Sequence, residues 1–217
     1  QVLAHAGVGW LLAEAGRGSR RFRQVVFLSA ILPDLDGLAL LFGVAAYGTW
    51  HDRITHSVPF ALVVSLLAVW LCRHERFRAL LFTQLGFWLH VVADYFLSGW
   101  PIALWFPFSR AVVVSNHALW LGHPVNYALA VLGVVIIFWL GQRFHRTPFE
   151  VFSEAFDRRV VNAFFRKRTL SCATCGRPAS EMCAQCGQPV CMRHAPLTRG
   201  FVAICRKCWE AGRQKPR

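Results

Sequence analysis

The feature that most constrains the fold is an apolar run from Leu119 to Leu140 that is nearly free of charge. At about 1.5 Å per helical residue this run can cross the roughly 30 Å hydrocarbon core of a bilayer. Four further apolar stretches precede it, at about 1–15, 25–48, 58–72 and 79–97. Only 16% of all residues are charged, against roughly 25% in an average soluble domain. The sequence therefore predicts an all-α fold, a multi-pass transmembrane bundle of about five helices.

Arginines are distributed unevenly among the loops between these stretches. The loops at 16–24 and 73–78 are rich in arginine, whereas the other two loops contain only Arg53 and Arg110. Residues 142–217 hold fifteen Lys and Arg against five Asp and Glu, and so carry most of the net charge of +13. Because positive segments stay in the cytoplasm, this pattern predicts an external N-terminus and a cytoplasmic C-terminal tail that faces anionic membrane lipids.

The composition changes after the last apolar stretch. Between 142 and 168, apolar residues recur at helical spacing with charges between them: Phe149, Phe152, Phe156, Val160 and Phe164. This spacing predicts an amphipathic helix on the inner leaflet, with a linker helix packed on the following module as the alternative. The expected domains are a transmembrane metal-site domain at 1–141, an amphipathic linker helix at 142–168 and a double-zinc module at 169–217.

Ionisable side chains interrupt the apolar stretches, although each costs at least about 2.5–3.5 kcal/mol at the centre of a spanning helix. Seven groups in or near the stretches are of only two kinds, His and Asp: His5, Asp34, Asp36, His51, His56, His90 and Asp94. Neutral imidazoles and carboxylates are the ligands that Zn²⁺, Mn²⁺ or Fe²⁺ prefer. We therefore predict a membrane metal site that holds one or more Zn²⁺ or other divalent ions, with a structural Asp34–Arg53 ion pair as the plainer alternative.

Two local patterns support this site. His90 and Asp94 are at i and i+4, on one helix face, which suits two ligands of one ion or a ligand and its orienting carboxylate. Pro33 removes a backbone donor and disturbs its helix beside Asp34 and Asp36, so that these carboxylates can face a cavity. The two carboxylates would point the same way on extended backbone but not on a regular helix.

At these residues the sequence resembles the bacterial and archaeal YdjM-type family of membrane-bound metal-dependent hydrolases. The matching features are His5 with Gly9, the runs "LPDLD" and "HDRITHS", and "HVVAD" followed by "SGWP". Together they cover about residues 1–110, and the combination is more specific than any one piece. That family is distantly similar to zinc-dependent phospholipase C and its related nucleases, in which His and Asp ligands on helices hold zinc ions. The resemblance implies a protein of the bacterial or archaeal cytoplasmic (inner) membrane.

The resemblance also implies a hydrolase that cleaves a phosphoester of a lipid or lipid-linked substrate with metal-activated water. The expected ligands are His56, Asp36, His90 and Asp94, with Asp34, His51 and His5 ligating or bridging. The expected catalytic residues are Arg53 for the transition-state phosphate, Asp34, and Thr55 or Ser57 as support for the ligands. Two alternatives remain, a non-catalytic membrane adaptor or assembly protein and a carrier of metal ions or protons.

The C-terminal tail contains four pairs of metal ligands, each with two residues between its members: Cys172/Cys175, Cys183/Cys186, Cys191/His194 and Cys205/Cys208. This spacing lets a tight turn present both side chains to one tetrahedral Zn²⁺. The ligand order resembles the cross-braced B-box and RING-like fingers, in which pairs one and three bind one ion and pairs two and four the other. Two sequential sites are the alternative.

Both tail sites would be closed and structural, and metal binding would supply much of the folding energy of so small a module. Modules of this kind usually bind proteins, so we expect a protein partner in addition to membrane lipids. The basic residues leave nucleic acid as a less favoured ligand, because the spacing of the fingers that read DNA is absent.

Overall fold

The computed structural model describes residues 1–51, 53–165, 171–177, 179, 181–191, 193–195, 197–198 and 202–213. The chain forms two compact units, Gln1–Phe165 and Arg166–Arg217.

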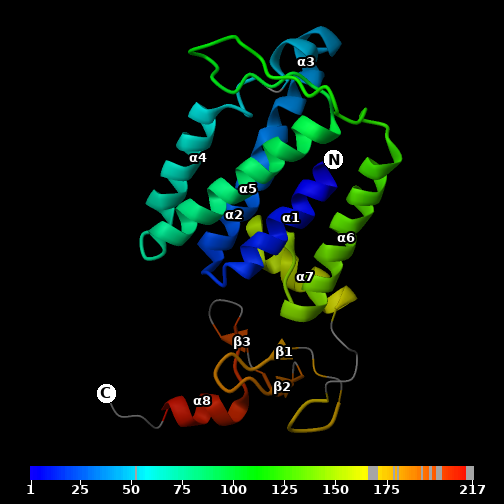
Figure 1. The fold of residues 1–217 in the computed structure, drawn as a ribbon. Coiled ribbons are helices and arrows are strands. Elements are labelled where there is room, and N and C mark those ends of the chain that lie inside the picture. The colour runs from blue at the N-terminus through cyan, green and yellow to red at the C-terminus, as the bar shows by residue number, and fades with distance from the viewer. Residues whose placement is uncertain are drawn as a thin grey trace. The chain divides into compact units, whose positions relative to one another are not determined.

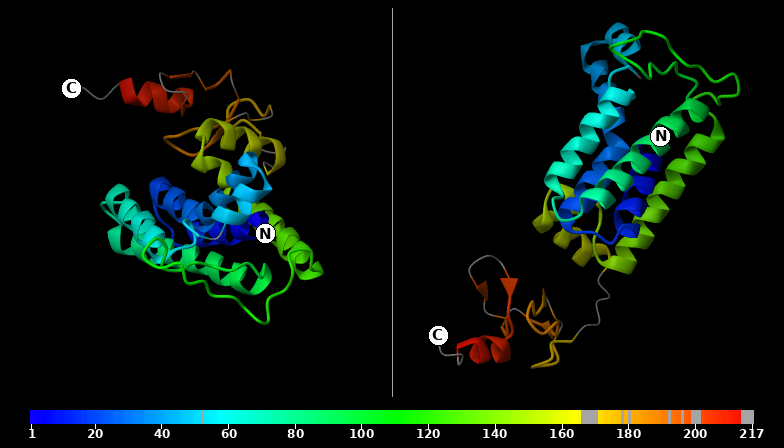
Figure 2. Two further views of the ribbon diagram at one scale, coloured as in Figure 1. Left: turned by 90° about the horizontal axis from the view of Figure 1, so that it is seen from above. Right: turned by 60° about the vertical axis from the view of Figure 1, so that its left-hand side comes forward.

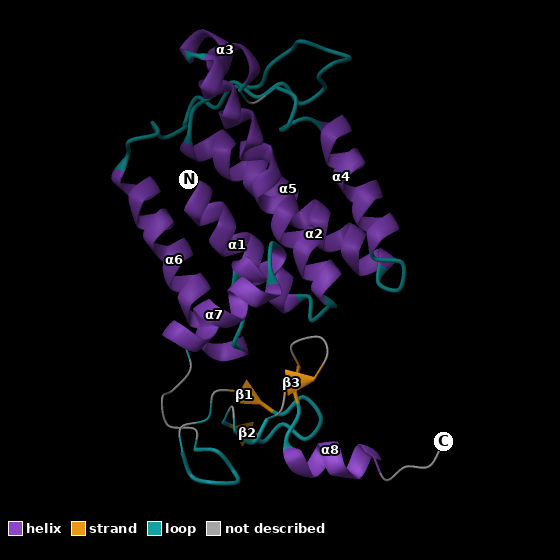
Figure 3. Ribbon diagram, turned by 180° about the vertical axis from the view of Figure 1, so that it is seen from behind, coloured by secondary structure: helices purple, strands orange, loops and turns teal. Residues whose placement is uncertain are grey.

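The first unit is built from helices (Figure 1). Its α-helices are α1 (Val2–Ala15), α2 (Arg20–Ile31), α3 (Val44–Trp50), α4 (Val58–Leu71), α5 (Arg76–Leu97), α6 (Pro124–Phe144) and α7 (Glu154–Phe164). Two 3₁₀ helices, η1 (Leu32–Phe42) and η2 (Pro148–Val151), complete it. Along the bundle α1, α4 and α6 run in one direction and α2 and α5 in the other. Figures 2 and 3 show α3 and the loop at 98–123 at one end of the bundle and α7 at the other.

Three helical segments are long and apolar enough to cross a membrane. They are Arg20–Phe42, which joins α2 to η1, Arg76–Leu97 and Pro124–Phe144, with mean hydropathies of 2.0, 1.3 and 2.0. Two shorter apolar helices, α1 and α4, correspond to the short first and third stretches of the sequence. The predicted bundle of apolar helices is therefore confirmed, with three long members and two short ones.

Large apolar side chains cover the outer surface of these helices. Leu66 and Trp70 on α4 and Tyr127 and Val131 on α6 are between 62% and 69% exposed. Apolar surface of this extent is typical of a face that contacts lipid.

Local signals in the sequence explain where several helices begin and end. The side chains of Ser19 and Ser57 accept hydrogen bonds from the backbone N–H groups of the first turns of α2 and α4. The α-helical pattern of α2 ends at Ile31, two residues before Pro33, and the chain continues as the 3₁₀ helix η1. Pro124, whose ring presets the helical backbone angle, begins α6.

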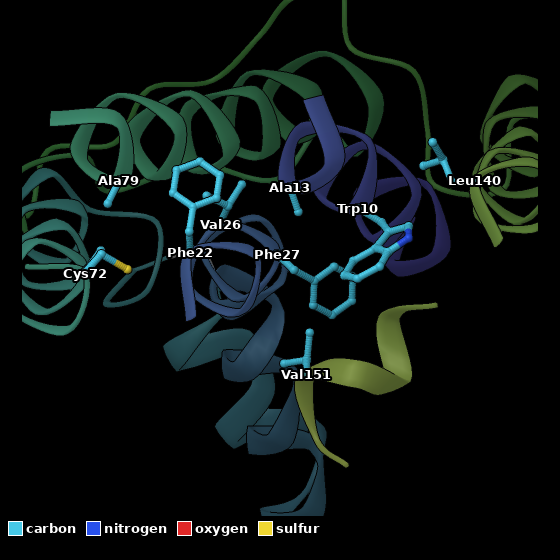
Figure 4. Packing of buried hydrophobic residues seen from close by; sticks show 10 residues of the cluster. Trp10, Ala13, Phe22, Val26, Phe27, Cys72, Ala79, Leu140 and Val151 are labelled. Atoms are coloured by element: carbon cyan, nitrogen blue, oxygen red, sulfur yellow. The ribbon is translucent and has the colours of Figure 1, made fainter. Parts of the chain in front are cut away.

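The apolar core lies between α1, α2 and the segments that pack on them. Trp10 on α1 and Phe22 and Phe27 on α2 are buried, and Leu140 and Val151 close the cluster (Figure 4). Figure 4 also shows Trp10 and Phe27 side by side, where their rings meet edge to face with centroids 5.9 Å apart.

Helix α1 crosses α6 at a point where both helices carry glycine. A Cβ atom added at Gly7 would overlap the Cα of Gly133, and one added at Gly133 would overlap the carbonyl oxygen of Leu3. Small residues allow this close backbone approach, which is a common way for helices to pack in membranes.

In the segment predicted as an amphipathic helix at 142–168, residues 142–165 form the end of α6, η2 and α7, and residues 166–168 lie outside the described part of the chain. A buried ionic network attaches η2 to the bundle, because Arg23 on α2 donates to both carboxylate oxygens of Glu150. Arg146 also pairs with buried Glu14 on α1 at 2.9 Å. Phe152 and Phe164 remain 71% exposed, as an amphipathic segment requires.

The second unit is small, and its described residues form two short hairpins and one helix. Strand β1 (Glu181–Met182) pairs antiparallel with β2 (Pro189–Val190), with Glu181 opposite Val190. Strand β3 (Leu197–Thr198) pairs antiparallel with β4 (Val202–Ala203), and α8 (Arg206–Arg213) follows. Its core contains Val190, Ala195 and Ala203 together with cysteines.

Candidate metal centre

Three imidazoles surround the buried carboxylate of Asp94, near the end of α5. Asp94 Oδ1 lies 3.1 Å from Nε2 of His5, on the first turns of α1. Asp94 Oδ2 lies 3.2 Å from Nε2 of His56, just before α4, and 3.0 Å from Nε2 of His90. All four side chains are 6% exposed or less. Residues from three separate parts of the sequence thus meet at one carboxylate.

The other ring nitrogen of His90 determines its tautomer. Nδ1 lies 2.7 Å from the carbonyl oxygen of Ala30 on α2, and a carbonyl can only accept a hydrogen bond. Nδ1 therefore donates to this carbonyl, and Nε2 is the ring nitrogen that faces Asp94. This is the orientation that metal-ligating histidines usually have.

His56 is oriented in the same way by a carboxylate. Its Nδ1 lies 3.3 Å from Oδ2 of Asp36, an oxygen that also accepts the hydroxyl proton of Thr55 at 2.9 Å. His56 therefore lies between two carboxylates, with Nδ1 toward Asp36 and Nε2 toward Asp94. That Nε2 lies 3.3 Å from His90 Nε2. Two imidazole nitrogens and a carboxylate therefore converge, a set of ligand atoms that suits a cation.

Asp34 adds a fifth member to the group. Single ligand atoms of His5, Asp34, His90 and Asp94 all lie within 4.8 Å of one another. Asp34 Oδ1 lies 3.9 Å from His90 Nε2, and Asp34 Oδ2 is buried without a hydrogen-bond partner among the described residues. A buried carboxylate oxygen without a donor is costly, and a bound cation would remove that cost.

Asp34 and Asp36 face different partners, because the 3₁₀ helix η1 separates side chains that are two positions apart. Asp36 Oδ1 lies 2.9 Å from Nδ1 of His51, whose ring stacks on Tyr47 at 4.3 Å and meets Trp100 edge-on. Asp36 and His51 therefore form an outer pair, which His56 joins to the inner group. The seven predicted ligands are thus divided between an inner group (His5, Asp34, His56, His90 and Asp94) and this outer pair.

Among the predicted catalytic residues, Asp34 belongs to the inner group, whereas Thr55 and Arg53 lie outside it. Thr55 contacts Asp36, as described above. Arg53 is half-buried in the loop before α4, and its guanidinium forms no ion pair with a carboxylate among the described residues, so the alternative Asp34–Arg53 pair is not observed. Ser57 donates to the carbonyl of Ile54 and caps α4.

Sequence reasoning missed the residues that bring the helices close enough to form this site. A Cβ atom added at Gly86 on α5 would lie 2.9 Å from Oγ of Ser29, and one added at Gly9 on α1 would lie 2.7 Å from Cβ of Ala30. Both helices therefore approach α2 at Ala30, whose carbonyl orients His90. The available signal was a glycine within an apolar helix, one turn before His90.

The spacing of these atoms fits a divalent metal. Ligand atoms that bind one tetrahedral zinc at about 2.0–2.1 Å lie about 3.3 Å apart. The four closest nitrogen–oxygen and nitrogen–nitrogen separations around Asp94 are between 3.0 and 3.3 Å.

In the C-terminal unit, the ligand pairs gather into two groups in the interleaved order. One contains Cys172, Cys175, Cys191 and His194, and the other contains Cys183, Cys186, Cys205 and Cys208. Sulfur atoms of Cys175 and Cys191 and of Cys186 and Cys205 are both 3.7 Å apart. A disulfide needs about 2.05 Å, whereas two thiolates on one zinc lie about 3.8 Å apart.

Backbone geometry prepares the first cysteine of each group for a metal. Gly176 and Gly187 follow the cysteine pairs with φ of 72° and 70°, which lets their N–H groups turn back to the carbonyls of Cys172 and Cys183. Although burial raises it, backbone N–H donors such as that of Cys191 lower the pKa of the Cys172 thiol to about 5. Backbone donors likewise lower the pKa of Cys183 to about 6, against the effect of burial.

Apolar helices with lipid-facing surfaces and a buried His/Asp cluster define a membrane protein with a candidate metal centre. Comparison with known proteins agrees, because the YdjM inner membrane protein family matches residues 1–156. The chain belongs to this family, and the matched residues include the whole His/Asp cluster.

One relative is the inner membrane protein YbcI of Escherichia coli (strain K12). It is 43% identical over 84 residues, which are 36% of this chain and 47% of the relative, so the match spans about half of that protein's length. No solved structure matches the chain.

Proposed function

We propose that this protein is a membrane-embedded, metal-dependent hydrolase that cleaves a phosphoester of a lipid or lipid-linked substrate. The observation that carries the proposal is the convergence of His56 Nε2 and His90 Nε2 on Asp94 Oδ2, with both rings oriented from behind by acceptors. Two imidazole nitrogens and a carboxylate oxygen at these separations form a donor set that suits a divalent cation.

His5, His56, His90 and Asp94 would hold the metal, and Asp34 would complete the set. A divalent ion bound there would supply an activated water at neutral pH and polarise the phosphoryl oxygen. Asp34 Oδ2, which has no donor among the described residues, would accept a proton from the attacking water. Arg53, whose guanidinium is not neutralised by a described carboxylate, would bind the phosphate oxygens.

The positions of the arginines support one orientation in the membrane. Arg20 and Arg23 begin α2, Arg76 begins α5 and Arg143 ends α6, all at the end of the bundle opposite the His/Asp cluster. The positive-inside rule favours a cytoplasmic location for the arginine end and for the tail that follows it. The cluster would then open toward the outer face of the membrane.

The C-terminal unit would bind two structural Zn²⁺ ions and dock a protein partner in the cytoplasm. Its two groups of four ligands leave no position for a substrate on a tetrahedral ion. Such a module supplies a small rigid surface, and the hydrolase chemistry belongs to the helices.

Metal analysis of the purified full chain tests the proposal. We expect wild type to contain the two tail ions and at least one more, and the His90→Ala/Asp94→Ala double variant to contain the tail ions only. A His117→Ala variant, in the exposed loop before α6, serves as the matched control and should retain wild-type metal content. Equal metal in wild type and the double variant would sink the proposal.

An activity assay completes the test. Metal-loaded wild type in detergent should release inorganic phosphate from phosphatidic acid or nitrophenol from a nitrophenyl phosphodiester, and the double variant should do neither. Metal in the cluster without hydrolysis of either probe would favour the carrier function instead.

A further inference from the structure

An elongated cavity lies beside the His/Asp cluster, between α1, α5 and α6. Its volume is about 250 Å³, and apolar side chains make up most of its lining, among them Val8, Leu89, Ala93 and Leu129. His5 and His90 of the cluster form part of its wall. The cavity therefore joins an apolar chamber to the candidate metal ligands.

The shape of the cavity follows helix α5. Its lining on that helix runs from Gly86 to Leu97, about 16 Å at 1.5 Å per residue. Near Leu97 the wall is polar, because Gln1 donates to the side chain of Asn126 there at 3.2 Å. Leu89 is 42% exposed, so the cavity reaches the lipid-facing surface of α5.

These features indicate which kind of molecule can occupy the cavity. Water would find few hydrogen-bond partners along the apolar walls. Sites for whole small molecules have volumes of about 300–1,000 Å³, so this cavity suits one part of a larger molecule. Inside a membrane, the abundant molecule with a long, narrow and apolar part is a lipid.

We propose that this cavity binds one hydrocarbon chain of a membrane lipid, which enters from the bilayer beside Leu89. This inference rests on the proposed function, and it makes the substrate a lipid whose reacting group lies near its chain, at His5 and His90. Binding the chain would fix the position of the reacting group, which is how remote binding contributes to catalysis.

Photolabelling tests the proposal on the full chain in phosphatidylglycerol vesicles. The probe is phosphatidic acid with a diazirine on one acyl chain, and labelled peptides are identified by mass spectrometry. We expect label to be concentrated on cavity residues of α1, α5 and α6. Leu129→Trp, which fills the cavity, should lower this labelling by about fivefold or more.

Two further variants keep the test decisive. Leu132→Trp lies on the same helix with its side chain 50% exposed and outside the cavity, and should label as wild type does. Val8→Phe fills the cavity from α1 and replaces Leu129→Trp if that variant does not fold. Label spread evenly over lipid-facing residues, or cavity labelling unchanged by both filling variants, would overturn the proposal.

The same samples separate this inference from the proposed function. If wild type lacks the membrane metal but labels the cavity, the hydrolase proposal fails while the lipid site stands. If it contains the metal and hydrolyses a probe but shows no enriched label, the lipid site fails and the hydrolase proposal stands.

Discussion

The Nε2 atoms of His56 and His90 lie 3.3 Å apart although the two residues are separated by 34 positions in the sequence. Each ring is oriented from behind, His56 by Asp36 and His90 by the carbonyl of Ala30. Both Nε2 atoms also face Asp94 Oδ2, at 3.2 and 3.0 Å, so that two imidazoles and one carboxylate oxygen meet at one point.

The carboxylate behind His56 should control metal affinity without touching the metal. Asp36→Asn can present its amide N–H₂ to His56 Nδ1 and so favour the wrong tautomer. We expect metal affinity to fall about 10- to 100-fold, measured by competition with a chelator. Asp157→Asn, the same chemical change on α7, should leave the affinity at the wild-type value. Equal affinities for both variants would show that Asp36 does not orient His56.

The glycine crossing of α1 and α6 should be intolerant of a side chain. Gly133→Ala introduces a Cβ against the backbone of Leu3, which cannot move as a flexible side chain can. We expect a loss of about 1–3 kcal/mol or more in stability, with less metal bound because α1 carries His5. Thermal unfolding in detergent measures the first effect and metal analysis the second. Gly48→Ala is the control, since nothing lies within 4 Å of its new Cβ, and a comparable loss there would contradict the packing explanation.

Removing one member of the buried ion pair that attaches η2 should strongly destabilise the folded protein. Arg23→Met leaves Glu150 as an unpaired buried carboxylate, and both side chains are only 10% exposed. We expect about 3–5 kcal/mol of destabilisation, seen as a lower midpoint of thermal unfolding. Arg158→Ala removes the exposed i,i+4 pair with Glu154 and should change stability by about 0–1 kcal/mol. Similar losses in the two variants would mean that burial of the Arg23 pair has no energetic consequence.

Absorption spectra of the cobalt-loaded protein test the interleaved ligand order of the C-terminal unit. Cys172→Ser and Cys191→Ser should both perturb the absorption bands of the Cys₃His site, because the interleaved order assigns them to one ion. Cys183→Ser and Cys205→Ser should perturb the Cys₄ site instead. In a sequential order, Cys172 would share its ion with Cys183, and the spectra would group the variants differently. Cys72→Ala, in the helical unit, should leave both sets of bands unchanged.

Much of the fold could be predicted because lipid imposes a simple rule on the chain. Apolar stretches of bilayer length must form helices that satisfy their own backbone hydrogen bonds, so the run up to Leu140 was sufficient to predict α6. The paired cysteines were equally informative, since two intervening residues suit one tetrahedral ion wherever the pair occurs. Periodicity alone did not predict the division of residues 142–165, because the buried Arg23–Glu150 pair that attaches η2 joins residues 127 positions apart.

For the candidate site, the sequence by itself determined which side chains could bind a metal. These are His and Asp side chains that are too costly to lie in lipid without partners. Only the tertiary structure decided how these side chains are grouped, with Asp34 turned to the inner group and Asp36 to His51 and His56. The physical reason is that side-chain direction depends on the 3₁₀ geometry of η1 and on helix contacts at Gly86 and Gly9. Such contacts join residues far apart in the sequence, so no local sequence pattern predicts them.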